Sequence, residues 1–228
     1  MRNYSPHSMR IRRPDEKSIE AISSIVAGQG QLFLKQKLEM GELILNFETK
    51  NKYEILTSSG QYHGAVIEES GGFWGFLNRT VFRSHRPFKI TVYNKSNVPI
   101  LRLERKFFWM FSDLFISDSH GTRIGSIHRR FGLLRKKYDL MDFNQMVFAQ
   151  INAPIWRIWT FKIFDVRGKE IGSISKKWTG VFKEVFTDSD SFGVDLSYSE
   201  WDTLKKVIVF CAAISVDFDF FEDNSNRH

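Results

Sequence analysis

The sequence predicts a mainly β protein, a closed antiparallel barrel whose core is an apolar helix near the C-terminus. Three observations predict this fold: a repeat of strand–turn–strand units, segments in which apolar and polar residues alternate, and an uncharged apolar run at residues 207–216. The chain has 228 residues, of which 42% are hydrophobic, and a chain of this size can bury one sizeable core. We therefore expect a barrel domain over residues 31–222, after a basic arm at residues 1–30 and before a tail at residues 223–228.

The arm at residues 1–30 is basic at its start and predicts one short helix. Its first 14 residues hold four arginines, Arg2, Arg10, Arg12 and Arg13. They include no apolar stretch of the kind that a secretory signal requires, so we expect a protein that is not secreted and remains in the cytoplasm. Residues 19–26 predict a short helix that ends at Gly28-Gln29-Gly30.

Two candidate hairpins come next along the chain. Residues 53–66 surround the turn Ser58-Ser59-Gly60, and residues 90–103 surround the turn at residues 94–97. Several hairpins at nearly regular spacing are typical of an antiparallel sheet that closes on itself. Closure leaves no strand edge exposed, and the lumen removes an apolar helix from water.

The strongest hairpin signal is an internal repeat. The pattern Asp-x-x-Gly-x-x-Ile-Gly-Ser-Ile at residues 118–127 recurs at residues 165–174, displaced by 47 positions. Each copy predicts a strand, a polar turn in which glycine supplies the positive φ, and a second strand. Both copies then continue into a basic pair and an aromatic residue.

The apolar run at residues 207–216 predicts the central helix. Ten helical residues reach about 15 Å, half of the ~30 Å that a membrane-spanning helix must match. A helix that is apolar around almost its whole circumference belongs inside a protein. Its expected core residues are Val207, Ile208, Phe210, Cys211 and Ile214. Cys211 is the single cysteine of the chain, and burial there makes it a poor nucleophile.

Several motifs in this order resemble those of the phospholipid scramblase family, within the wider tubby C-terminal-like group. The longest reads Ile-Gly-Ser-Ile-Ser-Lys-Lys-Trp-Thr-Gly at residues 171–180 and continues to Phe-Thr-Asp-Ser-Asp-Ser-Phe-Gly at residues 186–193. Residues 47–55, 86–88 and 217–222 are similar to further family motifs. The resemblance implies a twelve-stranded barrel around a hydrophobic helix. The cysteine clusters that are acylated in many animal members are missing, so acyl anchoring in that form is not expected.

The resemblance also implies a weak calcium site in the loop from Asp188 to Ser199. Asp188 stands at loop position 1, Asp190 at position 3 and the carbonyl of Val194 at position 7, an oxygen pattern that suits a hard cation. Position 12 departs from the pattern, because Ser199 stands where a bidentate carboxylate is expected. The alternative is a solvated turn before the C-terminal helix, with Ser199 and Asp202 as a capping pair.

Basic pairs follow both copies of the repeat. They are Arg129-Arg130 and Lys176-Lys177, and the chain carries a formal net charge of +7. Such residues are candidates for binding the headgroups of an anionic phospholipid membrane, at about 1 kcal/mol per charge near the surface. The alternative is that they are the wet strand faces of a basic protein.

Two aromatic clusters between predicted strands are candidates for membrane contact, since Trp and Phe are favoured at the interface. Their members are Phe73, Trp74, Phe76, Phe108 and Trp109. The alternative is that these side chains pack at the ends of the barrel.

The sequence indicates no catalytic residues, because it lacks the common nucleophile, zinc and phosphate-loop motifs. Three functions remain. The resemblance implies a phospholipid scramblase, which moves phospholipids in both directions between leaflets without an energy source, with calcium as a candidate activator and peripheral association with the inner face of a membrane. The alternative is a non-catalytic module that binds or tethers anionic phospholipids. Nucleic acid binding ranks last, because no recognition helix or stacking platform is predicted.

Overall fold

The protein is a closed twelve-stranded antiparallel barrel with a helix through its middle. The computed structural model describes residues 13–37, 52–69, 87–106, 113–130, 132, 135–154, 159–176 and 191–220. Around the barrel the strand order is β1-β12-β11-β10-β9-β8-β7-β6-β5-β4-β3-β2, and the strand pairs are antiparallel. The fold class predicted from the sequence is confirmed.

The helices are α1 (Glu16–Ser23) and α4 (Thr203–Phe220), and the strands are β1 (Gln31–Lys37), β2 (Lys52–Thr57), β3 (Tyr62–Glu68), β4 (Phe88–Asn94), β5 (Pro99–Arg105), β6 (Asp113–Asp118), β7 (Arg123–Arg130), β8 (Arg135–Met141), β9 (Val147–Pro154), β10 (Thr160–Asp165), β11 (Glu170–Ser175) and β12 (Ser191–Asp195).

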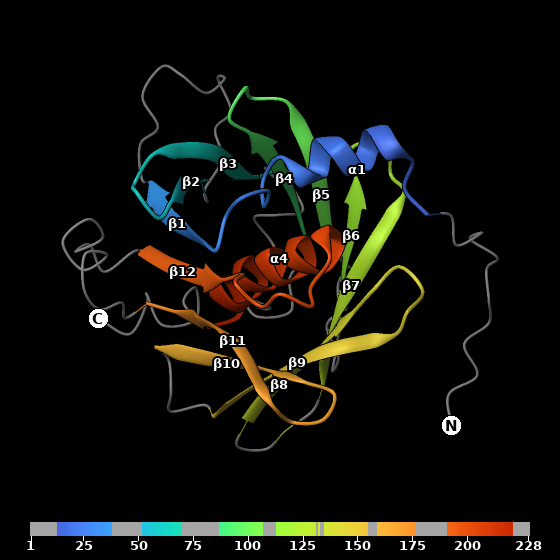
Figure 1. Ribbon diagram of the computed structural model, residues 1–228, viewed down its shortest axis with the longest axis vertical. Coiled ribbons are helices and arrows are strands. Elements are labelled where there is room, and N and C mark those ends of the chain that lie inside the picture. Colours follow the sequence, from blue (N-terminus) through green and yellow to red (C-terminus); the bar gives the residue numbers. More distant parts are fainter. Residues whose placement is uncertain are drawn as a thin grey trace.

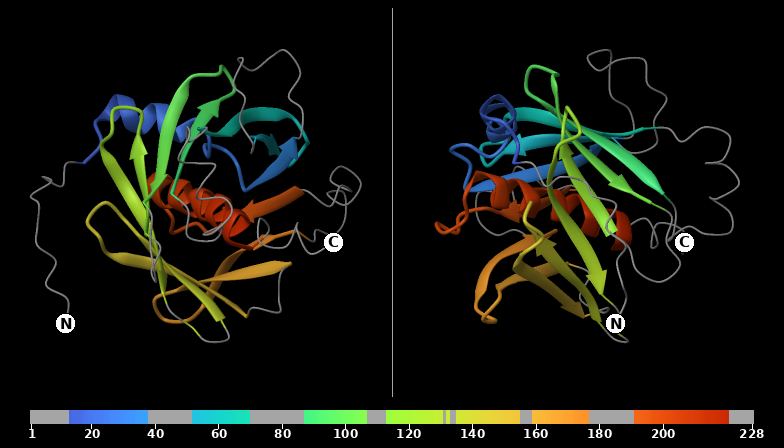
Figure 2. Two further views of the ribbon diagram at one scale, coloured as in Figure 1. Left: turned by 180° about the vertical axis from the view of Figure 1, so that it is seen from behind. Right: turned by 90° about the vertical axis from the view of Figure 1, so that its right-hand side faces the viewer.

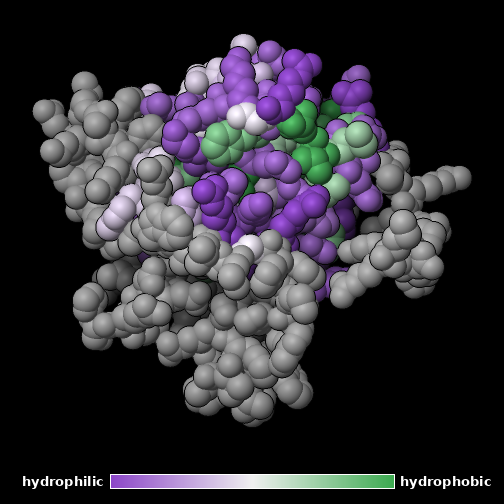
Figure 3. All heavy atoms as spheres, turned by 90° about the horizontal axis from the view of Figure 1, so that it is seen from below, coloured by the Kyte–Doolittle hydropathy of each residue, from purple (hydrophilic) through white to green (hydrophobic). Residues whose placement is uncertain are grey.

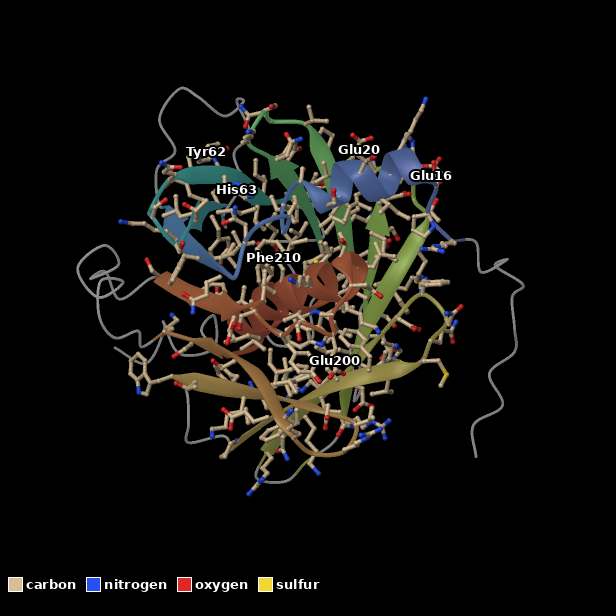
Figure 4. All side chains as sticks on the ribbon, viewed as in Figure 1. Glu16, Glu20, Tyr62, His63, Glu200 and Phe210 are labelled. Carbon is tan, nitrogen blue, oxygen red and sulfur yellow. The ribbon has the colours of Figure 1, made fainter. Side chains whose placement is uncertain are left out.

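The helix α4 crosses the middle of the ring of strands (Figure 1), and the two further views agree (Figure 2). Phe210 lies near the centre of the molecule (Figure 4). The five expected core residues of this helix are buried, and all belong to the one large hydrophobic core. The enclosed helix predicted from the apolar run is therefore confirmed. The described part of the face in Figure 3 is mostly hydrophilic, with a small hydrophobic group.

The helix α4 is longer than the apolar run because polar residues cap and extend it. It begins at Thr203, and the Lys205 N–H donates a hydrogen bond of 2.8 Å to Oδ1 of Asp202. Asp202 is therefore the N-cap residue. This corrects the expected capping pair, because Ser199 lies in the exposed turn that precedes the helix.

The helix α1 begins three residues before the helix expected at residues 19–26. Asp15 sets its start by accepting a hydrogen bond of 2.8 Å from the Ser18 N–H, and the helix ends at Ser23, before a run of turns. Ile22 and the residues just after the helix, Ile25 and Val26, belong to the main core cluster. Residues of the expected arm thus complete the core.

Five hairpin turns lie at the same end of the barrel and share one geometry. In each, the first and fourth residues form a backbone hydrogen bond, the fourth has a positive φ, and the register of the flanking strands shifts nearby. The first residues are Thr57, Asn94, Asp118, Asp142 and Asp165. The fourth residues are Gly60, Asn97, Gly121, Gln145 and Gly168, with φ between 58° and 87°.

The repeat of 47 positions therefore covers two hairpins. The turns at Asp118 and Asp165 are its two copies, and the turn at Asp142 lies between them. In the two outer turns an aspartate side chain accepts hydrogen bonds from the N–H groups two and four residues later. The middle turn has Gln145 where the outer turns have glycine, so sequence comparison does not reveal it.

Replacing Gln145 with glycine is expected to stabilise the protein by about 0.5–1 kcal/mol. Gln145 has a φ of 63°, a left-handed conformation that costs a side chain about 1–2 kcal/mol, partly offset by the greater chain entropy of glycine when unfolded. Urea denaturation measures the change. The reverse substitution, Gly168→Ala at a φ of 84°, should destabilise the protein. If the two variants are equally stable, a side chain in the left-handed conformation does not destabilise these turns.

The helix α4 approaches the barrel wall closely at Gly125 of β7. A Cβ at this position would lie 2.5 Å from Cδ1 of Ile208 and 2.6 Å from the carbonyl oxygen of Met141. Both distances are too short, and the carbonyl belongs to the backbone of a paired strand. The position therefore requires glycine for packing between helix and wall.

The substitution Gly125→Ala is expected to lower the free energy of unfolding by about 1–3 kcal/mol, the usual cost of overpacking a core. Chemical denaturation followed by tryptophan fluorescence measures it. Gly30→Ala is the control, because a Cβ there meets no atom within 4 Å. If both variants unfold at the same denaturant concentration, the contact with Ile208 does not limit this position.

Candidate functional site

The two ends of the barrel differ in their connections and in their charge. One end, the turn end, holds the five hairpin turns. At the other end the described strands flank residues 38–51, 70–86, 107–112, 155–158 and 177–190, which lie outside the described residues. The C-terminal end of α4 also lies there, because Asp217 contacts Tyr53 near the start of β2.

Basic residues gather at the end opposite the turns. Among the three residues of each strand nearest that end, eleven are Lys or Arg and four are Asp or Glu. Among the three nearest the turn end, one is basic and five are acidic. We call the end opposite the hairpin turns the basic end. Such a charge separation orients a molecule toward an anionic surface before any specific contact forms.

Three of the predicted headgroup residues, Arg129, Arg130 and Lys176, lie at the basic end. Alternation along β7 places the side chains of Arg129 and Arg130 on opposite faces of the strand. Arg129 follows Ile127 on the lumen-facing side and is paired with the buried Tyr138 of β8. Arg130 points outward, with 62% of its side chain exposed, and its Nε donates a hydrogen bond to Oδ2 of Asp139. A continuous pair of surface cations is therefore not formed here.

Lys176 follows β11 and lies beside the C-terminal end of α4. Its side chain is 12% exposed, and its Nζ lies 4.0 Å from Oδ1 of Asp217. The Tyr53 hydroxyl donates a hydrogen bond of 2.6 Å to Oδ2 of the same carboxylate. We call Tyr53, Lys176 and Asp217 the Asp217 cluster. The companion residue Lys177 lies outside the described residues, so headgroup binding stays a prediction.

An aromatic stack surrounds the Asp217 cluster. The ring of Phe218 lies 6.2 Å from that of Tyr53 and 4.9 Å from that of Phe88. The guanidinium of Arg105, which is 2% exposed, lies 4.2 Å from the Phe88 ring centroid, a cation–π contact. The last turn of α4 is thus fixed to strands β2, β4 and β11.

Sequence reasoning did not select Trp159, which is also at the basic end. It is 44% exposed, although most large hydrophobic residues of the described chain are buried, and its carbonyl accepts a hydrogen bond of 2.8 Å from the Lys176 N–H. An exposed indole next to a lysine suits a membrane interface. The signal in the sequence was a Trp between two predicted strands. The predicted contact residues Phe73, Trp74, Phe76, Phe108 and Trp109 lie outside the described residues.

The predicted calcium loop is described only in its second half. Asp188 and Asp190 lie outside the described residues. Val194 is a buried residue of β12, paired with Leu32 of β1 and Ile174 of β11, and Ser199 lies beyond β12 near the turn end. In the described ranges no three His, Cys, Asp or Glu side chains are placed to hold a metal. Calcium binding stays a prediction that depends on the two aspartates.

The remaining candidate group is the thiol of Cys211, which is fully buried in α4. Burial raises the pKa of this thiol well above its usual range, because the apolar surroundings disfavour the thiolate. A nucleophilic role for Cys211 is therefore not supported. The helices in the described part of the chain include none with the length and apolar character that crossing a membrane requires.

The protein is thus an antiparallel barrel that encloses its C-terminal helix and is basic at one end. The family model described as Scramblase matches residues 8–223, and the chain therefore belongs to the scramblase family.

Three individual proteins and one solved structure are among those similar to this chain. A phospholipid scramblase family protein of Schizosaccharomyces pombe is 26% identical, over 85% of this chain and 60% of its own length. The altered inheritance rate of mitochondria protein 25 of Saccharomyces cerevisiae is 24% identical, over 91% of this chain and 75% of its own length. Phospholipid scramblase 2 of Bos taurus is 28% identical, over 84% of this chain and 68% of its own length. An X-ray structure of an Arabidopsis thaliana protein is 10% identical, with a TM-score of 0.45 over 84% of this chain and 91% of that chain.

Proposed function

We propose that the protein is a phospholipid scramblase that moves phospholipids in both directions between leaflets, without an energy source, at an anionic membrane that its basic end faces. Membership of the scramblase family, over residues 8–223, is the observation that carries the proposal. The charge difference between the ends supports the orientation, because an anionic leaflet attracts each nearby Lys or Arg by about 1 kcal/mol. Calcium stimulation belongs to the proposal through Asp188 and Asp190.

The enclosed helix limits how such transport can occur. Moving α4 into lipid would expose the apolar lining of the barrel together with the helix itself, and the ten residues from Val207 to Val216 are almost fully buried. We therefore place lipid movement at the basic end. There the protein disturbs the bilayer from the membrane surface, while α4 stays enclosed in the barrel.

Purified protein added to liposomes tests the transport itself. The liposomes carry a phospholipid with a fluorescent headgroup, and a membrane-impermeant quencher removes the outer pool. A scramblase makes the inner pool accessible, with or without calcium; heat-unfolded protein is the control for leakage. An inner pool that stays protected in both conditions contradicts scrambling.

The second candidate function is a non-catalytic module that binds anionic phospholipids. The anchoring of α4 by the Asp217 cluster favours it, since such a barrel can dock without rearranging. Flotation with the same liposomes separates the two functions. A module floats with anionic vesicles and leaves the inner pool protected, whereas a scramblase floats with them and makes the inner pool accessible.

The double substitution Arg135→Glu/Lys137→Glu is expected to weaken binding to anionic vesicles at least 30-fold. Both residues are exposed at the basic end, and losing their attraction alone removes about 2 kcal/mol. Vesicle titration at fixed salt measures the affinity. Lys95→Glu/Arg167→Glu makes the same charge change at the exposed turns of the other end and should bind almost normally. If the two variants lose equal affinity, the basic end is not the docking face.

A further inference from the structure

Asp217 occupies an unfavourable position unless something compensates its charge. It lies in the last turn of α4 and is 5% exposed. The C-terminal end of a helix carries partial negative charge, so a carboxylate there is repelled. A buried carboxylate also loses its hydration. Tyr53 and Lys176 provide compensation, because one donates a hydrogen bond and the other brings a positive charge.

The contacts of Asp217 with Tyr53 and Lys176 differ in kind. The Tyr53 hydroxyl is hydrogen-bonded at 2.6 Å. The Lys176 Nζ, at 4.0 Å from Oδ1, is attracted to the carboxylate but is beyond the 2.7–3.2 Å of a direct hydrogen bond to that atom. A phosphate oxygen that reached the ammonium would form a shorter, charge-assisted bond.

Lys176 is the basic member of the Asp217 cluster. Its backbone is hydrogen-bonded to the exposed Trp159, and it lies at the end of the barrel where basic residues predominate. Phosphate groups that approach the basic end therefore come close to Lys176, whose contact with Asp217 is the longer of the two described.

We propose that a phosphate group of an anionic phospholipid binds Lys176 in place of Asp217, and that this exchange releases the last turn of α4 from β11. The inference rests on the proposed function, because it assumes that the basic end faces phospholipid. Asp217 keeps its hydrogen bond to Tyr53, while the ammonium of Lys176 no longer offsets the repulsion from the helix end. The released segment is the last turn, and the core around Phe210 stays closed.

Hydrogen exchange on the full chain tests the proposal. The probes are vesicles of phosphatidylcholine, the same vesicles with phosphatidic acid, and inorganic phosphate alone. With phosphatidic acid we expect the backbone amides of residues 217–220 to exchange about tenfold faster, as in local opening, while residues 207–213 stay protected and Cys211 stays unreactive to a thiol reagent. Inorganic phosphate that acts as strongly assigns the site to phosphate in general. Inorganic phosphate that has no effect assigns it to the lipid surface.

Matched variants make the result specific. Lys176→Met should show fast exchange at residues 217–220 without lipid and no further response to phosphatidic acid, and Lys176→Arg should restore the response. Lys95→Met removes an exposed lysine from a turn at the opposite end of the barrel and should behave as the unaltered protein. A circular dichroism spectrum confirms that each variant is folded.

The outcomes separate this inference from the proposed function. Unchanged exchange at residues 217–220, in protein that floats with phosphatidic acid vesicles, overturns the exchange at Lys176 and leaves membrane binding standing. Protein that does not float overturns the proposed docking and the inference with it. If phosphatidic acid accelerates hydrogen exchange at residues 217–220 equally in the Lys176→Met variant, the inference is also overturned, because Lys176 is then not the group that binds the phosphate.

Discussion

The substitution Phe210→Ala is expected to lower the free energy of unfolding by about 3–5 kcal/mol, the usual cost of removing a large aromatic side chain from a core. Phe210 is fully buried and is among the largest such side chains in the described chain. It lies in α4 with strands on all sides (Figure 4), so a closed barrel has little freedom to collapse onto the space left behind. The lost dispersion contacts and the residual cavity therefore both contribute.

Denaturation in guanidinium chloride, followed by fluorescence, measures this effect. Met146→Ala is the control, since Met146 is 65% exposed in the turn between β8 and β9, and its change should stay within about 0.5 kcal/mol. A loss below about 1 kcal/mol for Phe210→Ala would contradict the enclosed position of α4. A large loss is equally informative about function, because the same burial opposes any transfer of this helix into lipid.

The hairpins show how far sequence reasoning reaches in this fold. Glycine identified the turns at Gly121 and Gly168, because a tight turn needs a positive φ that glycine adopts without strain. The turn between β8 and β9 has the same conformation at Gln145, and no glycine marks this turn in the sequence. Closure of the ring by β1 and β12 joins segments from opposite ends of the chain, and local patterns carry no information about such a pairing.

The central helix was predicted for a different reason. An uncharged run that is too short to span a bilayer requires enclosure, and this requirement follows from hydrophobicity alone. The ends of the helix needed the structure. The start depends on the Asp202 cap, and the helix continues past Val216 because partners compensate the charge of Asp217.

Sequence reasoning selected residues that the structure places at the basic end, but it did not indicate how they are arranged. Arg129 and Lys176 were selected as members of basic pairs, and strand alternation places Arg129 and Arg130 on opposite faces of β7. The contact between Tyr53 and Asp217 joins residues 164 positions apart. Both lie in stretches that resemble family motifs, but neither stretch indicated a binding or catalytic role. Trp159 became a candidate only when its exposure was seen.

A double-mutant cycle at Lys176 and Asp217 is expected to give the second large effect. Lys176→Met alone should cost about 3 kcal/mol, because it leaves a carboxylate buried without its positive partner. Asp217→Asn alone should also destabilise, since it removes the negative charge beside the largely buried ammonium. The double variant leaves neither charge unpaired, and its loss should be smaller than the sum by at least about 1 kcal/mol.

The exposed pair of Lys162 and Glu170 is the matched comparison. Its charged atoms are closer, at 2.6 Å, but its side chains are 44% and 47% exposed, whereas those of Lys176 and Asp217 are 12% and 7% exposed. If burial decides the strength of an ion pair, the cycle with Lys162→Met and Glu170→Gln should give a coupling below about 1 kcal/mol. Equal couplings for the two pairs would mean that Lys176 does not fasten α4. A larger coupling at the buried pair gives the helix end an electrostatic attachment that a competing phosphate can weaken.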